Sequence, residues 1–259
     1  MIKSKFILAS LGAAAALLSN AHAAVVQLDR NESEVVNGAI FQFASPQPTG
    51  TTGTGFIDPF LRLHAGGNTG TEQGYNTSGR PTAFDELTDP NFTRNVLYSD
   101  LLKTQVTING STYFQLLLDV NEPGGSKSLV SLTELQIYTS GTGSQTTSNV
   151  ASLGTLRYDL DGNGDNTVVF DASLNHGSGS GDAYIYIPFF AAQNSDFVYL
   201  YAAFGDAEGD VQAGFEEFAL VHNVTPVPEL SSFFPIIGLM VAVGSTSYLR
   251  KRKLAQTVA

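Results

Sequence analysis

The feature that most constrains the fold is a series of short β-type segments between residues 24 and 224. Each segment is rich in Val, Ile, Phe, Tyr or Thr and is bounded by Gly, Asn, Asp, Ser or Pro, the composition of strands and turns. We find no stretch with a sustained apolar period of 3.6 residues and caps at both ends. Strands separated by turns, without helices between them, predict an all-β domain, an antiparallel β-sandwich of jelly-roll-like type.

The strongest local signal is the pair Asn109-Gly110, which separates the segments 105–108 and 111–116. A type I′ turn needs φ > 0 at two successive residues, and Asn-Gly provides both at little steric cost. The sequence therefore predicts a β-hairpin here. Other segments with apolar alternation predict four more strands, at residues 130–138, 182–187, 197–201 and 215–221.

Three segments rich in Gly, Ser, Thr, Asn or Pro predict long surface loops, at residues 46–55, 66–82 and 140–148. The segment 140–148 is also compatible with a boundary between two domains. The sequence thus leaves open one or two β domains, and we expect one.

Composition excludes two classes of function. Between residues 24 and 224 the chain carries seven Lys and Arg against 23 Asp and Glu, a net charge of −16. Binding to phosphates requires the opposite sign, so we expect no nucleic-acid partner. The chain has no Cys, which excludes disulfides, thiol catalysis and thiolate metal sites.

Residues 1–23 predict a secretory signal peptide. Lys3 and Lys5 precede an apolar run over residues 6–18, which is too short to span a membrane. A small residue, a spacer and a second small residue then end the segment at Ala23. We expect signal peptidase to cut between Ala23 and Ala24, so that the exported chain begins at Ala24 and the domain occupies residues 24–224.

Residues 225–259 predict a membrane-sorting tail. The turn Val227-Pro228-Glu229 precedes 19 uncharged residues, 231–249, about the length of one membrane crossing. A basic cluster follows, and by the positive-inside rule it marks the cytoplasmic end of a single transmembrane helix. The cluster consists of Arg250, Lys251, Arg252 and Lys253.

This order of Pro-Glu turn, apolar span and basic cluster resembles the PEP-CTERM sorting signal of exported proteins in bacteria that make exopolysaccharide. Leu230 stands where the family has a second proline. The resemblance implies that an exosortase cleaves the tail and releases the domain to the cell surface or extracellular matrix. Three stretches, 74–77, 116–121 and 214–218, also resemble an uncharacterised ectodomain often found with this tail, which implies no known chemistry.

The best candidate for a metal site is the loop that contains Asp159, Asp161, Asn163 and Asp165. Oxygen ligands at alternate positions of a tight loop suit Ca²⁺, which takes 6–8 oxygens. The twelfth position of the corresponding calcium loop is Phe170, where a bidentate Glu belongs. The alternative is a polar turn between two strands, since Asp, Asn and Gly are also the residues of tight turns.

A second acidic loop contains Asp206, Glu208 and Asp210 and is followed by Glu216 and Glu217. Two carboxylates across a cleft can hydrolyse a glycosidic bond, so a polysaccharide hydrolase is the remote alternative. Glu216 and Glu217 cannot form that pair, because adjacent residues of a strand face opposite sides.

No catalytic residue is assigned. The histidines His64, His176 and His222 share no metal-ligand spacing, and the chain has no Gly-x-Ser-x-Gly motif. The alternating pairs Tyr184/Tyr186 and Tyr199/Tyr201 indicate packing in preference to a sugar-binding platform. We therefore predict an exported, non-catalytic surface or matrix protein. Its partners would be signal peptidase, an exosortase, the membrane and exopolysaccharide, and calcium-dependent carbohydrate binding is the main alternative.

Overall fold

The computed structural model describes residues 23–29, 32–44, 57–64, 66, 69–122, 128–174, 181–205, 209–211 and 214–222. The signal peptide before Ala23, the predicted loop 46–55 and the whole sorting tail, with Val227, Pro228, Glu229 and Arg250–Lys253, lie outside the described residues. No helix of the described part is long and apolar enough to cross a membrane.

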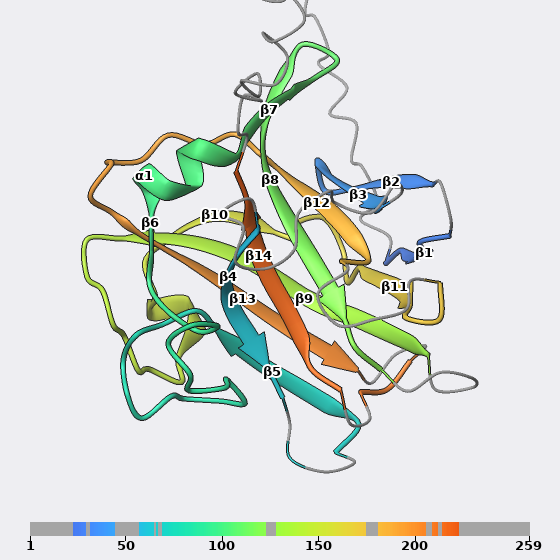
Figure 1. Cartoon of the computed structure of the whole chain (residues 1–259). Helices are drawn as coiled ribbons and strands as arrows, with labels where there is room; N and C mark the ends of the chain where they lie inside the picture. The colour runs from blue at the N-terminus through green and yellow to red at the C-terminus, as the bar shows by residue number, and fades with distance from the viewer. Residues whose placement is uncertain are drawn as a thin grey trace, which may run out of the picture.

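The described strands form two seven-stranded sheets that lie face to face (Figure 1). The first sheet runs β1 (Val25–Gln27), β11 (Thr167–Asp171), β9 (Leu129–Ser140), β13 (Phe197–Gly205), β5 (Thr71–Tyr75), with β10 (Thr155–Asp159) on β9 and β6 (Val96–Leu97) on β13. The second sheet runs β2 (Ser33–Val36), β3 (Ala39–Phe43), β12 (Ala183–Pro188), β8 (Ser111–Val120), β14 (Glu216–Val221), β4 (Ile57–Leu63), with β7 (Gln105–Ile108) on β8.

The main core lies between the two sheets. Apolar side chains from the inner face of each sheet interdigitate, and the rings of Phe204 on β13 and Phe218 on β14 lie 6.0 Å apart. The short helix α1 (Tyr98–Leu101) and the 3₁₀ turn at Leu102–Thr104 close the core at one end. The prediction of an all-β sandwich is confirmed, because two sheets with apolar inner faces bury a common core.

The predicted hairpin is confirmed. Asn109 and Gly110 have φ angles of 50° and 83° and join β7 to β8, as a type I′ turn requires. A second Asn-Gly pair, Asn37-Gly38, makes the same turn between β2 and β3, with φ angles of 44° and 86°. The four other predicted strands correspond to β9, β12, β13 and β14.

Two predictions about the sheets were wrong. The predicted loop 66–82 contains a strand, β5, which pairs with β13 through Tyr75 opposite Tyr201. The sequence of β5, Thr-Glu-Gln-Gly-Tyr, has little β preference, and its pairing with a long neighbouring strand decides its conformation. The fold is also not wholly antiparallel, because β1 pairs parallel to β11.

Two loops cover the outer face of the first sheet. Residues 76–95 and 141–153 pack against a second apolar cluster that contains Tyr75, Tyr199 and Tyr201. Tyr199 is fully buried and Tyr201 is 8% exposed, so this pair packs, as predicted. Tyr186 on β12 is equally covered, whereas Tyr184 is partly exposed. The segment 140–148 is a loop between β9 and β10, which pair directly with each other.

Candidate functional site

The loop with the predicted metal ligands connects β10 to β11, which both pair with the same strand, β9. Its centre is the side chain of Asn166, which is only 3% exposed. The Nδ2 atom of Asn166 donates to the carbonyl of Leu160 at 2.7 Å and to Oδ1 of Asn163 at 3.0 Å. Its backbone N–H donates to Oδ1 of Asp161 at 2.7 Å. The loop is therefore ordered by its own hydrogen bonds.

The four predicted ligands differ in exposure. Asp159 and Asp161 are half-buried, whereas Asn163 and Asp165 are exposed. Oδ1 of Asp159 accepts a hydrogen bond from the backbone N–H of Asp161 at 3.1 Å, as in a tight polar turn. In the part of the chain that the structure describes, none of the three aspartates forms an ion pair with Lys or Arg. The loop thus concentrates negative charge, and no basic side chain among the described residues forms an ion pair with it.

A fourth carboxyl group, that of Glu134 on β9, shares this electrostatic environment. Burial and, to a smaller extent, the negative charges of Asp161, Asp159 and Asp165 together raise the pKa of Glu134 to about 7. Burial also raises the pKa of Asp161. Glu134 could not be found from a sequence pattern, because only the pairing of β10 with β9 brings this residue beside the loop.

The calcium site stays a prediction. Among the residues described here, no three His, Cys, Asp or Glu side chains lie close enough together to hold a metal ion. One oxygen of Asp159 and one of Asp161 already accept backbone hydrogen bonds within the loop. A cation at this loop would have to rely on the remaining oxygens, on backbone carbonyls and on water.

The predicted signal-peptide cleavage site lies directly beside this loop. The backbone N–H of Ala24 donates to Oδ1 of Asn166 at 3.2 Å, and the N–H of Thr167 donates to the carbonyl of Ala24 at 2.8 Å. Ala23 and Ala24 are both exposed. The strand β1 starts at the next residue, Val25, so the described fold begins where processing is expected to leave the new N-terminus.

Most of the second acidic region, the remote candidate for a hydrolase site, lies outside the described residues, so that alternative stays a prediction. Asp210 is exposed, and Asp206 and Glu208 lie outside the described residues. Glu216 and Glu217 face opposite sides of β14, as predicted, because Glu216 interacts with Glu72 on β5 and Glu217 pairs with Arg62 on β4.

Glu72 and Glu216 form a buried carboxyl pair between the two sheets, with exposed fractions of 2% and 0%. Burial and the neighbouring carboxyl of Glu72 raise the pKa of Glu216 well above its usual range. One proton held between the two groups avoids placing two negative charges together in the interior. The pair is closed off from solvent, so we assign it to the interior packing and not to catalysis.

Arg62, His64 and His222 each contact residues of neighbouring segments of the fold. The Nε atom of Arg62 donates to Oε2 of Glu217 at 2.7 Å, and its guanidinium lies between the rings of Phe92 and Phe215. His64 contacts the carbonyl of Gly214, and His222 lies 3.5 Å from Asp58. The third histidine, His176, lies outside the described residues.

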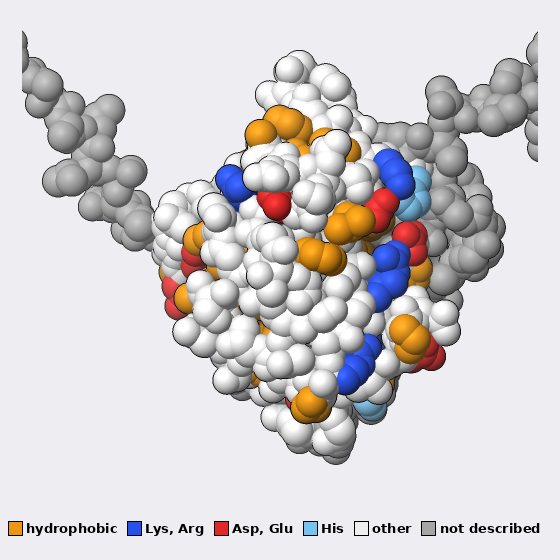
Figure 2. Space-filling model, turned by 90° about the vertical axis from the view of Figure 1, so that its left-hand side faces the viewer, with side chains coloured by type: hydrophobic (Ala, Val, Ile, Leu, Met, Phe, Trp, Pro, Cys, Tyr) orange, Lys and Arg blue, Asp and Glu red, His pale blue; other side chains and the backbone are white. Residues whose placement is uncertain are grey.

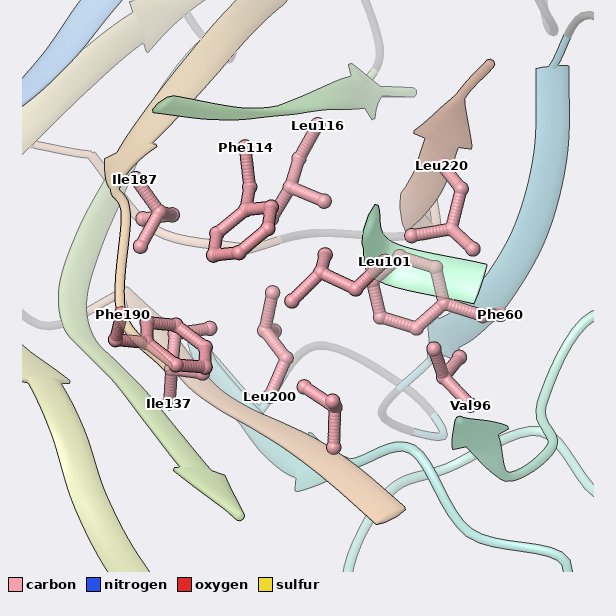
Figure 3. A pocket seen from close by; sticks show the side chains of 11 residues that line it. Phe60, Val96, Leu101, Phe114, Leu116, Ile137, Ile187, Phe190, Leu200 and Leu220 are labelled. Carbon is pink, nitrogen blue, oxygen red and sulfur yellow. The ribbon is translucent and has the colours of Figure 1, made fainter. Parts of the chain in front are cut away.

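A small apolar cavity lies in the main core next to α1, whose residue Leu101 helps to line it (Figure 3). Its volume is about 10 Å³, roughly the space of one water molecule, and its lining is wholly apolar. Side chains of both sheets and of α1 point into it, including Phe114, Leu116 and Ile187 from the second sheet and Ile137 and Leu200 from the first. A cavity of this size and lining is a packing defect and not a ligand pocket.

On the face shown in Figure 2, most of the surface is formed by the backbone and by side chains that are neither charged nor hydrophobic. Hydrophobic side chains on this face occur singly or in small groups. Large hydrophobic residues that are at least one-third exposed in the described part are few and well separated in the sequence: Val25, Val35, Leu97, Leu156 and Phe189.

Comparison with known proteins identifies no relative. No family model, no curated protein and no solved structure matches this chain.

Proposed function

We propose that this chain is an exported, non-catalytic protein of the bacterial surface or extracellular matrix, with a single jelly-roll-like domain. A single C-terminal helix would hold it in the membrane until an exosortase cuts the tail. The observation that carries the proposal is the order of the Pro228-Glu229 turn, the uncharged span 231–249 and the basic cluster 250–253. Exopolysaccharide would surround the released domain.

The ends of the described strands support this proposal. The last strand, β14, ends at Val221, before the turn at Pro228-Glu229, and the first strand begins at Val25, just after the expected cut at Ala23. Both cuts would therefore leave every described strand intact. Processing at both ends would release a domain that keeps all of these strands.

The surface is also suited to a hydrated polysaccharide layer. The face in Figure 2 presents mainly hydroxyl, amide and backbone groups, which exchange hydrogen bonds with sugars and water alike. The net charge of −16 between residues 24 and 224 keeps copies of the domain apart and soluble.

The first test is the intact mass of the protein recovered separately from membranes and from culture medium. We expect a species in the medium that begins at Ala24 and ends at Pro228 or Glu229. A single membrane-bound species that still carries residues 231–259 would contradict the sorting part of the proposal.

The residue after Glu229 provides a sharper test. Replacing Leu230 by proline restores the Pro-Glu-Pro motif of the resembling family, so Leu230→Pro is expected to raise the processed fraction of the protein several-fold. Leu254→Pro makes the same change beyond the basic cluster and should leave processing unaltered. Mass spectrometry measures the processed fraction of each chain. Equal fractions in the wild type and both variants would mean that an exosortase does not recognise this turn.

A further inference from the structure

We propose that the loop of residues 159–166 is the binding site for the α-ammonium group that signal peptidase creates at Ala24. The inference rests on the proposed export and on the cut between Ala23 and Ala24. It assigns the acidic loop to an internal ligand, the processed N-terminus of the same chain.

The position of Ala24 is the first argument. Its nitrogen already lies 3.2 Å from Oδ1 of Asn166, the buried side chain that organises the loop. The carbonyl of Ala24 accepts a hydrogen bond from Thr167, and the parallel pairing of Val25 with Thr167 continues the contact. Ala24 is thus held at the loop by two hydrogen bonds, one from its N–H to a side chain of the loop and one to its carbonyl from the backbone of β11.

Charge is the second argument. The loop carries Asp159, Asp161 and Asp165, and within the described ranges none of them pairs with a Lys or Arg side chain. Before cleavage the nitrogen of Ala24 is a neutral amide with one N–H donor. After cleavage it becomes an ammonium group with three donors, and it is largely charged at neutral pH because its ordinary pKa is about 8. Processing therefore adds one positive charge at a loop that carries three negative ones.

The length of β1 explains why such an anchor matters. The strand has only three residues, lies at the edge of the first sheet and pairs with β11 alone in the described part of the chain. Short terminal strands fray unless something holds their ends. An ammonium group held by the loop would fix β1, and with it the connection between β10 and β11.

The test uses the chain 24–259 in detergent, produced as a fusion to a carrier that a protease removes. One preparation begins at Ala24, and a matched control carries one additional Gly before Ala24, which moves the ammonium group away from the loop. Each is also made with the double substitution Asp161→Asn and Asp165→Asn. Asparagine at position 161 can still accept the hydrogen bond from Asn166, so the loop keeps its internal bonding.

We expect the additional Gly to lower the melting temperature by about 2–4 °C with the native loop and by much less with the substituted loop. A reagent selective for α-amines should label the Ala24 chain with a midpoint about one pH unit above that of the Gly control. The groups that set this midpoint are Asp159, Asp161 and Asp165 of the loop and Glu134 of β9.

Three results would overturn the proposal. The first is an equal melting temperature with and without the additional Gly. The second is a penalty for Gly that is undiminished both in the doubly substituted loop and in Asp165→Asn alone, which changes an exposed side chain and should fold normally. The third is a rise in melting temperature with millimolar Ca²⁺ that the loop substitutions abolish, because the loop would then be a metal site.

Failure of this proposal is distinguishable from failure of the proposed export. The fusion chain begins at Ala24 whatever signal peptidase does, so it tests binding of the ammonium group alone. The mass of the exported protein separately reports where signal peptidase cuts.

Discussion

The free energy of unfolding is expected to fall by several kcal/mol as the pH rises from about 4 to about 8, and Asp182 is expected to cause much of the fall. Asp182 is 4% exposed, and burial raises its pKa to about 8. The folded chain therefore keeps this proton up to about pH 8, whereas the unfolded chain loses it near pH 4. Between these values the folded state binds more protons, so stability decreases with pH, by about 1.4 kcal/mol per unit of pKa shift at most.

The pKa values of four other carboxyl groups are also raised in the folded state, so their effect on stability has the same sign. Burial raises the pKa of Glu216 well above its usual range, that of Glu134 to about 7, and also the pKa values of Glu86 and Glu217. Each contributes stability that is complete below about pH 4 and is lost as the pH rises through its folded-state pKa. The domain should thus be most stable in mildly acidic solution.

Urea unfolding at intervals between pH 4 and pH 9 measures this dependence. The variant Asp182→Asn should lose much of the slope and exceed the wild type by about 2 kcal/mol at pH 8, since the amide can still accept the 2.7 Å hydrogen bond from Val120 without a buried charge. Glu34→Gln removes one charge from an exposed position and should leave the slope unchanged. A stability that increases from pH 4 to pH 8 would contradict the burial of a protonated Asp182.

Replacing Asn76 by alanine is expected to cost about 3 kcal/mol. Asn76 follows directly after β5, and its side chain is fully buried. This side chain forms hydrogen bonds with the backbone of β13, as a neighbouring strand would. Its Oδ1 accepts from the N–H of Leu200 at 2.6 Å, and its Nδ2 donates to the carbonyl of Val198 at 2.8 Å. Alanine leaves these two buried backbone groups without partners, and each unsatisfied group costs about 1–3 kcal/mol.

Chemical denaturation measures this loss, and Asn91→Ala is the matched control. Asn91 lies on the same covering loop but is exposed, and its side chain donates to the exposed Asp89, so its replacement should cost less than about 0.5 kcal/mol. Similar costs for the two variants would mean that water satisfies the backbone of β13 when the Asn76 side chain is absent.

The fold could be predicted where local chemistry decides the conformation. Asn109-Gly110 specifies its turn by backbone preference, and the long strands β9 and β13 show alternating apolar residues. β5 could not be predicted in this way, because its conformation depends on pairing with β13, which follows more than a hundred residues later. The parallel pairing of β1 escaped prediction for the same reason.

The candidate site, like the fold, could be predicted only where the residues involved are close in the sequence. The spacing of Asp159, Asp161, Asn163 and Asp165 identified the loop, because these residues are close in the sequence. The residues from distant parts of the chain that contact this loop could not be predicted. Asn166 meets Ala24 across 142 positions of the chain, and Glu134 reaches the loop only through the pairing of β9 with β10. Local patterns show which residues form a turn, and the sheet decides what the turn contacts.

The position of β14 has a consequence for how the chain reaches its native state. β14 is the last described strand to be synthesised, yet it lies between β8 and β4, and in the described part it is the only strand that pairs with β4. During synthesis β4 is made early with the apolar residues Phe60, Leu61 and Leu63, and its partner strand is made more than 150 residues later. A stop codon before Glu216 would therefore remove one strand and leave a second without its partner, so that truncated chains should be degraded by proteases.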